Sequence, residues 1–449
     1  MSITFQAVSW DAKDIEDEDE GSKDYQIIIF GRTFDNRSIC VKTFYNPYFY
    51  VEVPMKWKKT DAAYLIQTVK KELYSRGNDI IDWCLENKTK MYGFTNKENF
   101  KFLKIVFKNR HAWSSAGRVF KKPLKILGKS KTFQRYEANL DPMIRFAHEQ
   151  DIPFSCCIKI EKYNEIEKDS YGRYSNCDLE LNVKCTDIAR DPDRDEIAPL
   201  VQCSFDIETY SGDGSFPLAE KPECPVLQVA STYQVYGEKH FEKQLFSVGK
   251  CDPIEGVEVI ECDDERELLN RWAEQIKAKQ VDIITGYNIW KFDLSYMFIR
   301  AEYCGAEEFM KLGKVNDYEA FLRDYSFSSS AYGDNHYKML DIPGVLQLDL
   351  LVIMQREHKL VSYKLDNVAK HFLKEQKVDM PYKLMFKKLV GTAKDRHDVG
   401  VYCVQDTMLP QRIINKLSIL PNMIEMSKAT WVPLSFLNEK YRLSVRFIR

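Results

Sequence analysis

The sequence predicts two kinds of domain in one chain: a mostly-β α+β domain, followed by an α/β domain with a mixed sheet. The length of 449 residues is enough for two or three separate hydrophobic cores. Short β-rich runs dominate the first 140 or so residues, with few segments of helical periodicity between them. After residue 195 strand-like runs alternate with amphipathic helical segments, which is the pattern of an α/β domain.

The composition is that of an ordinary intracellular protein. Hydrophobic residues make up 44% of the chain and charged residues 29%. We expect no membrane-spanning helix, because no stretch of about 18 apolar residues is present. The first residues, Met-Ser-Ile-Thr-Phe-Gln, lack the basic and apolar regions of a secretory signal. The twelve cysteines include no Cys-x-x-Cys pair, so we predict reduced, mostly buried thiols.

The elements of the first domain follow from β-branched and aromatic runs bounded by turn residues. The acidic segment 11–20 is predicted to be a mobile surface segment. The polar segment 190–195 is predicted to be a linker, so the first domain is expected to span residues 1–195. The predicted strands are 25–30, 40–44, 46–54, 103–107 and 156–160, and the predicted helices are 61–73 and 142–149.

A basic stretch, residues 101–135, contains no acidic residue. Interleaved aromatic residues suit contacts with nucleic-acid phosphates combined with base stacking, and Lys121, Lys122 and Lys125 are candidate DNA contacts. A solvated basic surface over an ordinary core explains the pattern equally well, so both interpretations stay open. The basic residues are Lys101, Lys104, Lys108, Arg110, Arg118, Lys121, Lys122, Lys125, Lys129, Lys131 and Arg135, and the aromatic residues are Phe102, Phe107, Trp113, Phe120 and Phe133.

The second domain is predicted from alternating strand and helix patterns after residue 195. The serine-rich segment 325–334 is predicted to be a loop or hairpin. Ser362 is predicted to cap a further helix. The predicted strands are 200–208, 226–235, 243–248 and 281–285, and the predicted helices are 264–278 and 288–303.

Two carboxylates stand near the end of the first strand of this domain, in Phe205-Asp206-Ile207-Glu208-Thr209. Side chains alternate along a strand, so Asp206 and Glu208 are predicted to point to the same face. Neighbouring anions repel, and burying them without a partner is costly. A hard divalent cation such as Mg²⁺ or Mn²⁺ relieves both problems, because it prefers carboxylate oxygens. Two solvated acids at a strand end are the simpler interpretation of this pentapeptide alone.

Two later segments supply further acids. Asp293, in Gly286-Tyr-Asn-Ile-Trp-Lys-Phe-Asp293, follows a predicted strand and is expected in the first turn of a helix at the sheet edge. Tyr402 and Asp406 are one turn apart in a predicted helix and can reach one site. Taken singly, these groups are more typical of helix-stabilising or surface residues.

In order along the chain, the segments FDIET, YNxxxFD and YxxxD resemble the three exonuclease motifs of family B DNA polymerases and of DEDDy 3′–5′ exonucleases generally. The similarity runs from about residue 25 to residue 437 and is most specific for delta-type catalytic subunits. It rests also on the segments NPYFYVEVP (46–54), YEAN (136–139), IAPL (197–200), GSFP (214–217), HFLKEQK (371–377) and NMIEMSKATWVPLSF (422–436).

The resemblance implies a ribonuclease-H-like exonuclease domain over residues 196–420, a mixed sheet flanked by helices, that acts on the 3′ end of a DNA strand with two Mg²⁺ or Mn²⁺ ions. It implies that Asp206, Glu208 and Asp406 ligate one ion. Asp206 then bridges to the second ion, which Asp293 holds through water. Tyr402 orients the attacking water through a hydrogen bond. It acts in this way and not as the base, because a phenol with a pKa near 10 is a poor base at neutral pH.

The resemblance also places the Thr209 backbone, Asn288 and Phe292 near the terminal nucleotides, and Phe216 near the frayed strand. The expected partners are DNA, the remainder of a replicative polymerase and its clamp, in a nucleus or at a viral replication site. Residues 421–449 are expected to begin the connection to a polymerase palm.

Two departures from the family pattern bear on function. The D-x-x-S-L-Y-P-type and Y-G-D-T-D polymerase signatures and the cysteine-rich zinc modules are absent from these 449 residues, so we expect no polymerisation by this chain as given. After Phe436 the sequence LNEKYRLSVRFIR differs from the expected R-G-Q-Q-type stretch. Two other functions stay open: a non-catalytic DNA-binding or scaffold fragment with a vestigial nuclease site, and a free-standing DEDDy exonuclease.

Overall fold

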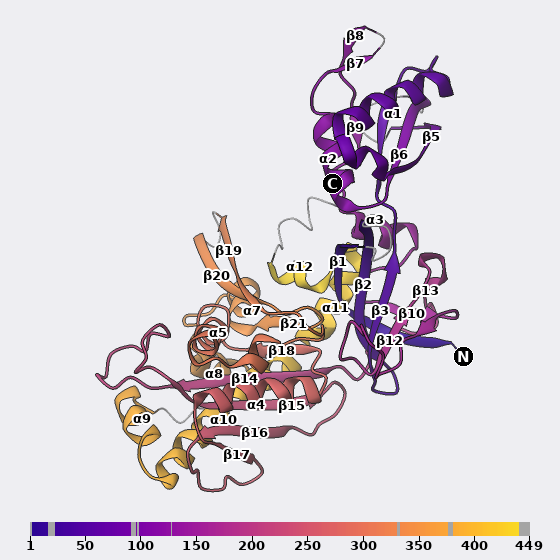
Figure 1. The fold of residues 1–449 in the computed structure, drawn as a ribbon. Helices are drawn as coiled ribbons and strands as arrows, with labels where there is room; N and C mark the ends of the chain where they lie inside the picture. Colours follow the sequence, from indigo (N-terminus) through magenta and orange to yellow (C-terminus); the bar gives the residue numbers. More distant parts are fainter. Residues whose placement is uncertain are drawn as a thin grey trace.

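The computed structural model describes residues 2–16, 23–90, 96, 98–126, 128–329, 333–375 and 380–439. Figure 1 shows three parts: an outer lobe that carries α1 and β5–β9, a sheet built around β1–β3, and a larger α/β part that carries β14–β21. No helix among the residues described is both long and apolar enough to cross a bilayer.

The sheet nearest the N-terminus has seven strands in the order β11-β12-β3-β2-β1-β10-β13. Residues such as Phe5, Ile27 and Phe154 are fully buried in the core that it shares with α3 (Pro142–Glu149). Its strands are β1 (Ile3–Glu16), β2 (Lys23–Thr33), β3 (Ser38–Phe44), β10 (Cys157–Ile160), β11 (Asn164–Glu165), β12 (Leu179–Asn182) and β13 (Ile188–Arg190).

The acidic segment 11–20 is not a mobile surface segment throughout, which corrects the prediction. Residues 11–16 continue β1 and pair antiparallel with β2, from Asp11 opposite Ile28 to Glu16 opposite Lys23. The Lys23 ammonium lies 2.6 Å from the Glu16 carboxylate. The charge pattern alone hid this strand, because Lys23, the cross-strand partner of Glu16, belongs to the next strand, β2. Residues 17–20 fall outside the described part of the chain.

The outer lobe has the order β-α-β-β-α-β, with an antiparallel sheet β5-β6-β4-β9 covered on one face by two helices. Leu65 and Val69 from the first helix and Ala112 and Ala116 from the second are buried against that face. The elements are β4 (Tyr48–Val53), α1 (Lys59–Leu73), the 3₁₀ helix η1 (Tyr74–Asp79), β5 (Ile80–Lys88), β6 (Phe100–Phe107), α2 (Arg110–Val119), the hairpin β7 (Leu124–Ile126) and β8 (Lys129–Lys131), and β9 (Arg135–Tyr136).

The aromatic residues of the basic stretch belong to the core. Phe102, Phe107, Phe120 and Phe133 are each at most 4% exposed. The half-buried Trp113 donates its indole N–H to the Tyr48 carbonyl at 3.2 Å. These rings are therefore not platforms for bases, and only the basic side chains of this stretch remain available to a nucleic acid.

The second sheet has the order β17-β16-β15-β14-β18-β21, in which β15 runs antiparallel to both neighbours and β18 and β21 run parallel to β14. This is the predicted ribonuclease-H-like mixed sheet, and helices cover both of its faces (Figure 1). Its strands are β14 (Val201–Thr209), β15 (Val226–Val235), β16 (Glu242–Val248), β17 (Glu258–Cys262), β18 (Ile283–Gly286) and β21 (Leu346–Asp349).

Two predictions for this domain are wrong, the start of one helix and the cap of another, and a third is confirmed. The helix expected over 288–303 is α5 (Asp293–Cys304), because Asn288 has a positive φ of 71° that no helix accepts. The serine-rich segment, predicted to be a loop or hairpin, lies within the antiparallel pair β19 (Phe321–Ser329) and β20 (Gly333–Asp341), which confirms the hairpin. Ser362 is not the helix cap, since α8 (Leu365–Phe372) begins after Lys364 and the Ser362 hydroxyl accepts a hydrogen bond from Asn367 at 2.9 Å.

The remaining helices are mostly on the α/β part, and α11 reaches back to residues beside the first sheet. The Ser427 hydroxyl on α11 lies 2.9 Å from that of Ser155, and the Trp431 ring stacks on His148 of α3. The helices not yet given are α4 (Glu265–Ala278), α6 (Glu307–Met310), α7 (Leu350–Glu357), α9 (Tyr382–Leu389), α10 (Ala393–Lys416), α11 (Ile419–Thr430) and α12 (Leu434–Glu439), with the short 3₁₀ helix η2 (Cys185–Asp187).

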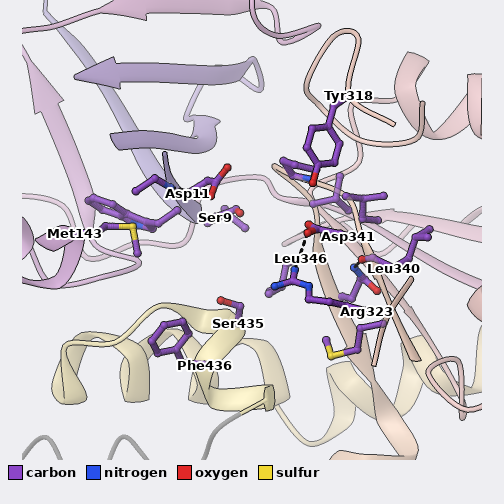
Figure 2. Close-up of a pocket in the computed structure, with 18 of the residues that line it drawn as sticks. Ser9, Asp11, Met143, Tyr318, Arg323, Leu340, Asp341, Leu346, Ser435 and Phe436 are labelled. Carbon is purple, nitrogen blue, oxygen red and sulfur yellow. Dashed lines mark hydrogen bonds and ion pairs between the residues drawn. The ribbon is translucent and has the colours of Figure 1, made fainter. Parts of the chain in front are cut away.

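A pocket of about 580 Å³ separates the seven-stranded sheet from the β19–β20 hairpin and α12. In Figure 2, Ser9 and Asp11 face Arg323 and Asp341 across this space, and Ser435 lies on its floor. Arg323 and Asp341 form an ion pair at 3.1 Å. None of the predicted catalytic residues lines this pocket.

Candidate active site

Strand β14 divides its side chains between the two faces of the sheet. Cys203, Phe205 and Ile207 enter the apolar core beside Trp272 of α4. The alternate residues Asp206 and Glu208 point to the opposite face, where α10 lies. The prediction that these two acids share a face is consistent with this arrangement.

Close packing fixes α10 on that face. The hydroxyls of Thr407 and Thr232 are 2.6 Å apart, and the Gln411 amide donates to the Gln202 side-chain oxygen at 3.2 Å. A Cβ on Gly400 would lie 2.3 Å from Leu245 Cδ2, so a larger residue here would force the Leu245 side chain to move, and glycine allows the present approach of helix to sheet. The helix therefore carries its polar residues directly over β14.

Asp206, Glu208 and Cys403 form the centre of the site. A ligand atom from each lies within 4.8 Å of the others. The Cys403 sulfur is 3.6 Å from the Asp206 carbonyl oxygen and 4.0 Å from its carboxylate. Burial raises the pKa of the Cys403 thiol well above its ordinary value, and the charges of Glu208, Asp206 and Asp406 raise it further. The thiol is therefore neutral and sits among three acids.

Cys403 was not predicted as a site residue. It lies three positions before Asp406 on the same helix, and residues so spaced share a helix face. That spacing was the signal in the sequence that pointed to it.

Asp293 joins the cluster from the other side of β14. It is the first residue of α5 and is 4% exposed. Burial raises its pKa to about 7, and the charges of Asp349 and Asp406 add to the rise, while backbone amides, that of Ile207 among them, oppose it. The structure thus brings all four predicted acids together from three elements.

Asp349 is a fifth acid that the sequence did not reveal. It ends β21, is 1% exposed, and burial raises its pKa to about 6. Its carboxylate accepts the backbone N–H of Asn288 at 2.9 Å and of Trp290 at 3.1 Å. It therefore holds the loop that leads into Asp293. The available signal was its place at the carboxyl end of a strand parallel to β18.

The predicted nucleotide contacts lie at two places. Thr209 ends β14 and is buried, whereas Asn288 and Phe292 are half-buried in the loop before α5. Phe216 is 69% exposed, and its ring centroid is 5.6 Å from that of Phe292. Half-buried Tyr402 lies on α10, one turn before Asp406. The other predicted contacts are on the outer lobe: Lys121 and Lys122 follow α2, and Lys125 is on β7. In Figure 1 these elements lie at the opposite end of the molecule from β14 and α10.

The donor set fits hard divalent cations. The site offers carboxylate oxygens from β14, α5 and α10, which are the ligands that Mg²⁺ and Mn²⁺ prefer. The groups that raise the pKa values of Asp293 and Cys403 include other carboxylates of the cluster. Bringing like charges together in a buried site is unfavourable unless a cation or a proton compensates them.

Replacing Asp293 by asparagine should change how stability depends on pH in metal-free buffer. The native carboxyl keeps its proton up to about pH 7, whereas the unfolded one loses it near pH 4, so wild-type stability falls as the pH rises between these values. The Asp293→Asn variant has no carboxyl to titrate at this position, so its stability does not fall in this way. The free energy of unfolding of the variant minus that of wild type should therefore increase by about 1 to 4 kcal/mol as the pH rises towards 8. Thermal unfolding in EDTA across this range measures it, and a constant difference would contradict the shifted pKa.

Comparisons with known proteins identify the family of this chain. The family described as DNA polymerase family B, exonuclease domain, matches residues 133–368. A DNA polymerase of Paramecium bursaria Chlorella virus NY2A is 33% identical over 97% of this chain and 47% of its own length. The DNA polymerase delta catalytic subunit of Oryza sativa is 34% identical over 91% of this chain and 38% of its own length.

A solved structure has the same fold. The family B DNA polymerase of the archaeon Pyrobaculum calidifontis matches with a TM-score of 0.67 at 18% identity, over 97% of this chain and 48% of that one. The chain spans less than half the length of each of these three relatives. The match over residues 133–368 covers more than half of the sequence, so the chain belongs to DNA polymerase family B and contains its exonuclease domain.

Proposed function

We propose that this chain hydrolyses the 3′-terminal phosphodiester of single-stranded or frayed DNA, as a 3′–5′ exonuclease of a delta-like DNA polymerase. The observation that supports it most is the convergence of Asp206, Glu208, Asp293 and Asp406 from β14, α5 and α10. Residues 196–420 are the proposed catalytic unit, with residues 1–195 before it and residues 421–449 as the start of a connection to a palm.

The proposed metal ligands are the four acids. Asp206, Glu208 and Asp406 all lie close enough to Cys403 for their charges to raise its pKa, and the charge of Asp406 also acts on Asp293 of α5. Two bound Mg²⁺ or Mn²⁺ ions would activate water and stabilise charge on the phosphate and on the leaving 3′-oxygen. The protein contributes a rigid set of oxygens, because β14 lies inside the sheet and α10 is packed against it.

Other side chains would place the terminal nucleotide. Asn288 and Phe292 belong to the loop that Asp349 fixes, so their positions are set before DNA binds. Phe216, with its exposed ring beside Phe292, offers an apolar contact for an unstacked base. Selection for mismatched ends then follows from their cheaper unpairing.

The wider setting is part of the same proposal. DNA is the substrate, and the remainder of a replicative polymerase and its clamp are the partners, in a nucleus or at a viral replication site. The names of the relatives support this, since they are DNA polymerases of a virus and of a plant.

Dependence on divalent ions tests the proposed function. Single-stranded DNA should be degraded with Mg²⁺ or Mn²⁺ and remain intact with EDTA, because acids alone cannot activate water next to an anionic phosphate. A fully paired 3′ end should be degraded more slowly. Degradation that persists in EDTA would contradict the proposal.

Replacing Tyr402 by phenylalanine should slow the chemical step by about 10- to 100-fold, because one hydrogen bond to the attacking water is lost. DNA affinity should stay near wild type, since the ring remains in place. Single-turnover cleavage and equilibrium binding separate the two quantities. A wild-type cleavage rate would remove Tyr402 from the mechanism.

A further inference from the structure

The outer lobe contains a pocket that the exonuclease site does not use. Its volume is about 710 Å³, and it lies between α1, η1, α2 and the segment that leads into β7. In Figure 1 these elements are at the opposite end of the molecule from β14 and α10. Four cationic residues line it: Arg76, Arg118, Lys122 and Lys125.

Among the described residues, no carboxylate forms an ion pair with the four cations of this pocket. Glu72 is the one acid among its lining residues, and it forms no ion pair with these cations within the described part of the chain. The guanidinium groups of Arg76 and Arg118 both donate to the hydroxyl of Ser115, at 3.5 and 3.0 Å. Ser115 is only 5% exposed, so its hydroxyl is held in place and keeps the two guanidinium groups close together. An anion that accepts from both would relieve their repulsion.

Tyr74 stands at the rim of the same pocket with its side chain 85% exposed. Its backbone has φ 53° and ψ −130°, a conformation that strongly favours glycine. Such strain costs on the order of 1 kcal/mol or more, and an exposed ring gains little packing in return. A tyrosine held this way is instead suited to stack on a ligand.

We propose that this pocket binds a single strand of nucleic acid, with phosphates held by the four cations and one base stacked on Tyr74. Regularly spaced phosphates match several separated cations, and an aromatic ring beside them matches an unstacked base. A paired duplex has no free base face to offer Tyr74. The site goes beyond the proposed exonuclease, because it shares no residue with the carboxylate cluster.

Two pairs of exposed lysines on the outer lobe give a matched test. Lys122 and Lys125 line the pocket, whereas Lys59 and Lys129 do not. K122Q/K125Q and K59Q/K129Q in the full chain each remove two positive charges. Anisotropy of labelled oligodeoxythymidylate, measured in EDTA to prevent cleavage, gives the affinity. Oligouridylate in parallel shows whether DNA, RNA or both are accepted.

We expect K122Q/K125Q to weaken binding about tenfold and to lower the slope of log affinity against log salt by about 1.4, since each phosphate contact on a single strand contributes about 0.7. K59Q/K129Q should stay within about twofold of the parent. Equal losses in the two pairs would overturn the proposal, because they would indicate general attraction to a basic surface. Equal affinity for a blunt duplex would also overturn it.

Substitutions of Tyr74 give a second, independent test of the proposed binding site. Y74G should weaken binding and also raise the melting temperature, because glycine relieves the strain at φ 53°. Y74F should bind like the parent, since its ring stacks equally well. A stable Y74G protein that binds with the parent's affinity would contradict the proposal, and so would loss of binding in Y74F.

Discussion

Replacing Asp206 and Glu208 together by alanine should abolish degradation of single-stranded DNA, by a factor on the order of 10³ or more. Both carboxylates lie on one face of β14 within 4.8 Å of the Cys403 sulfur. Their loss removes the oxygens that would hold the divalent ions, and nothing else in the cluster replaces them at that point. The measurement is the single-turnover cleavage rate with Mg²⁺.

The control must remove two acids of no catalytic role. Glu274 on α4 and Glu302 on α5 are exposed helix residues, so E274A/E302A matches the change in charge. That variant should cleave at the wild-type rate. In EDTA the melting temperature of D206A/E208A should equal or exceed that of wild type, because removing clustered anions relieves repulsion. A D206A/E208A protein that cleaves like wild type would show that the cluster is not the active site.

Replacing Asp282 by alanine should destabilise the protein by about 3 to 5 kcal/mol, the largest effect on stability that we expect. Its carboxylate is completely buried where the α/β sheet meets the N-terminal sheet. Arg32 of β2 contacts it at 2.5 Å, and Lys314 forms a second ion pair. Loss of the carboxylate leaves two buried cations together, so urea unfolding should show a lower midpoint.

Replacing all three charged residues by hydrophobic ones shows whether D282A is destabilised by uncompensated charge or by lost side-chain volume. Converting Arg32, Asp282 and Lys314 together to Met, Leu and Met should restore much of the lost stability, because no buried charge then remains uncompensated. If D282A unfolds at the wild-type midpoint, the cluster does not hold the two sheets together.

Acid should weaken the same contact. Burial acts to raise the pKa of Asp282, but Lys314 and Arg32 outweigh it and leave the pKa below the ordinary value. A carboxyl with a depressed native pKa stabilises the fold above its unfolded pKa, and this contribution is lost as the pH falls through the native pKa. Wild-type stability should therefore fall below about pH 4, while D282A should lose less over that range.

Much of the α/β part was predictable because its signals are local. Alternation along β14 correctly indicated a shared face for Asp206 and Glu208, and helical spacing correctly placed Tyr402 and Asp406 one turn apart. The resemblance to family B polymerases then supplied the order of the motifs. The ribonuclease-H-like fold is confirmed by the strand order around β14.

What the sequence did not reveal depends on contacts between distant segments. Asp349 enters the site only because β21 pairs with β18, 60 or so residues earlier in the chain. Asn288 was expected inside a helix, yet Asp349 holds that loop in a conformation with positive φ. The aromatic residues of the basic stretch looked equally suited to stacking or to a core, and tertiary packing alone decided for the core. The pocket beside Tyr74 likewise forms only when α1 and α2 lie side by side.

The most direct test of the account is the polarity of digestion. An oligonucleotide with a 5′ label, incubated with the chain and Mg²⁺, should give a ladder of labelled products that shorten by one nucleotide at a time. The same strand labelled at its 3′ end should release the label at once as a mononucleotide. Immediate release of the 5′ label as a mononucleotide, or a single internal cut, would contradict a 3′–5′ exonuclease centred on Asp206, Glu208, Asp293 and Asp406.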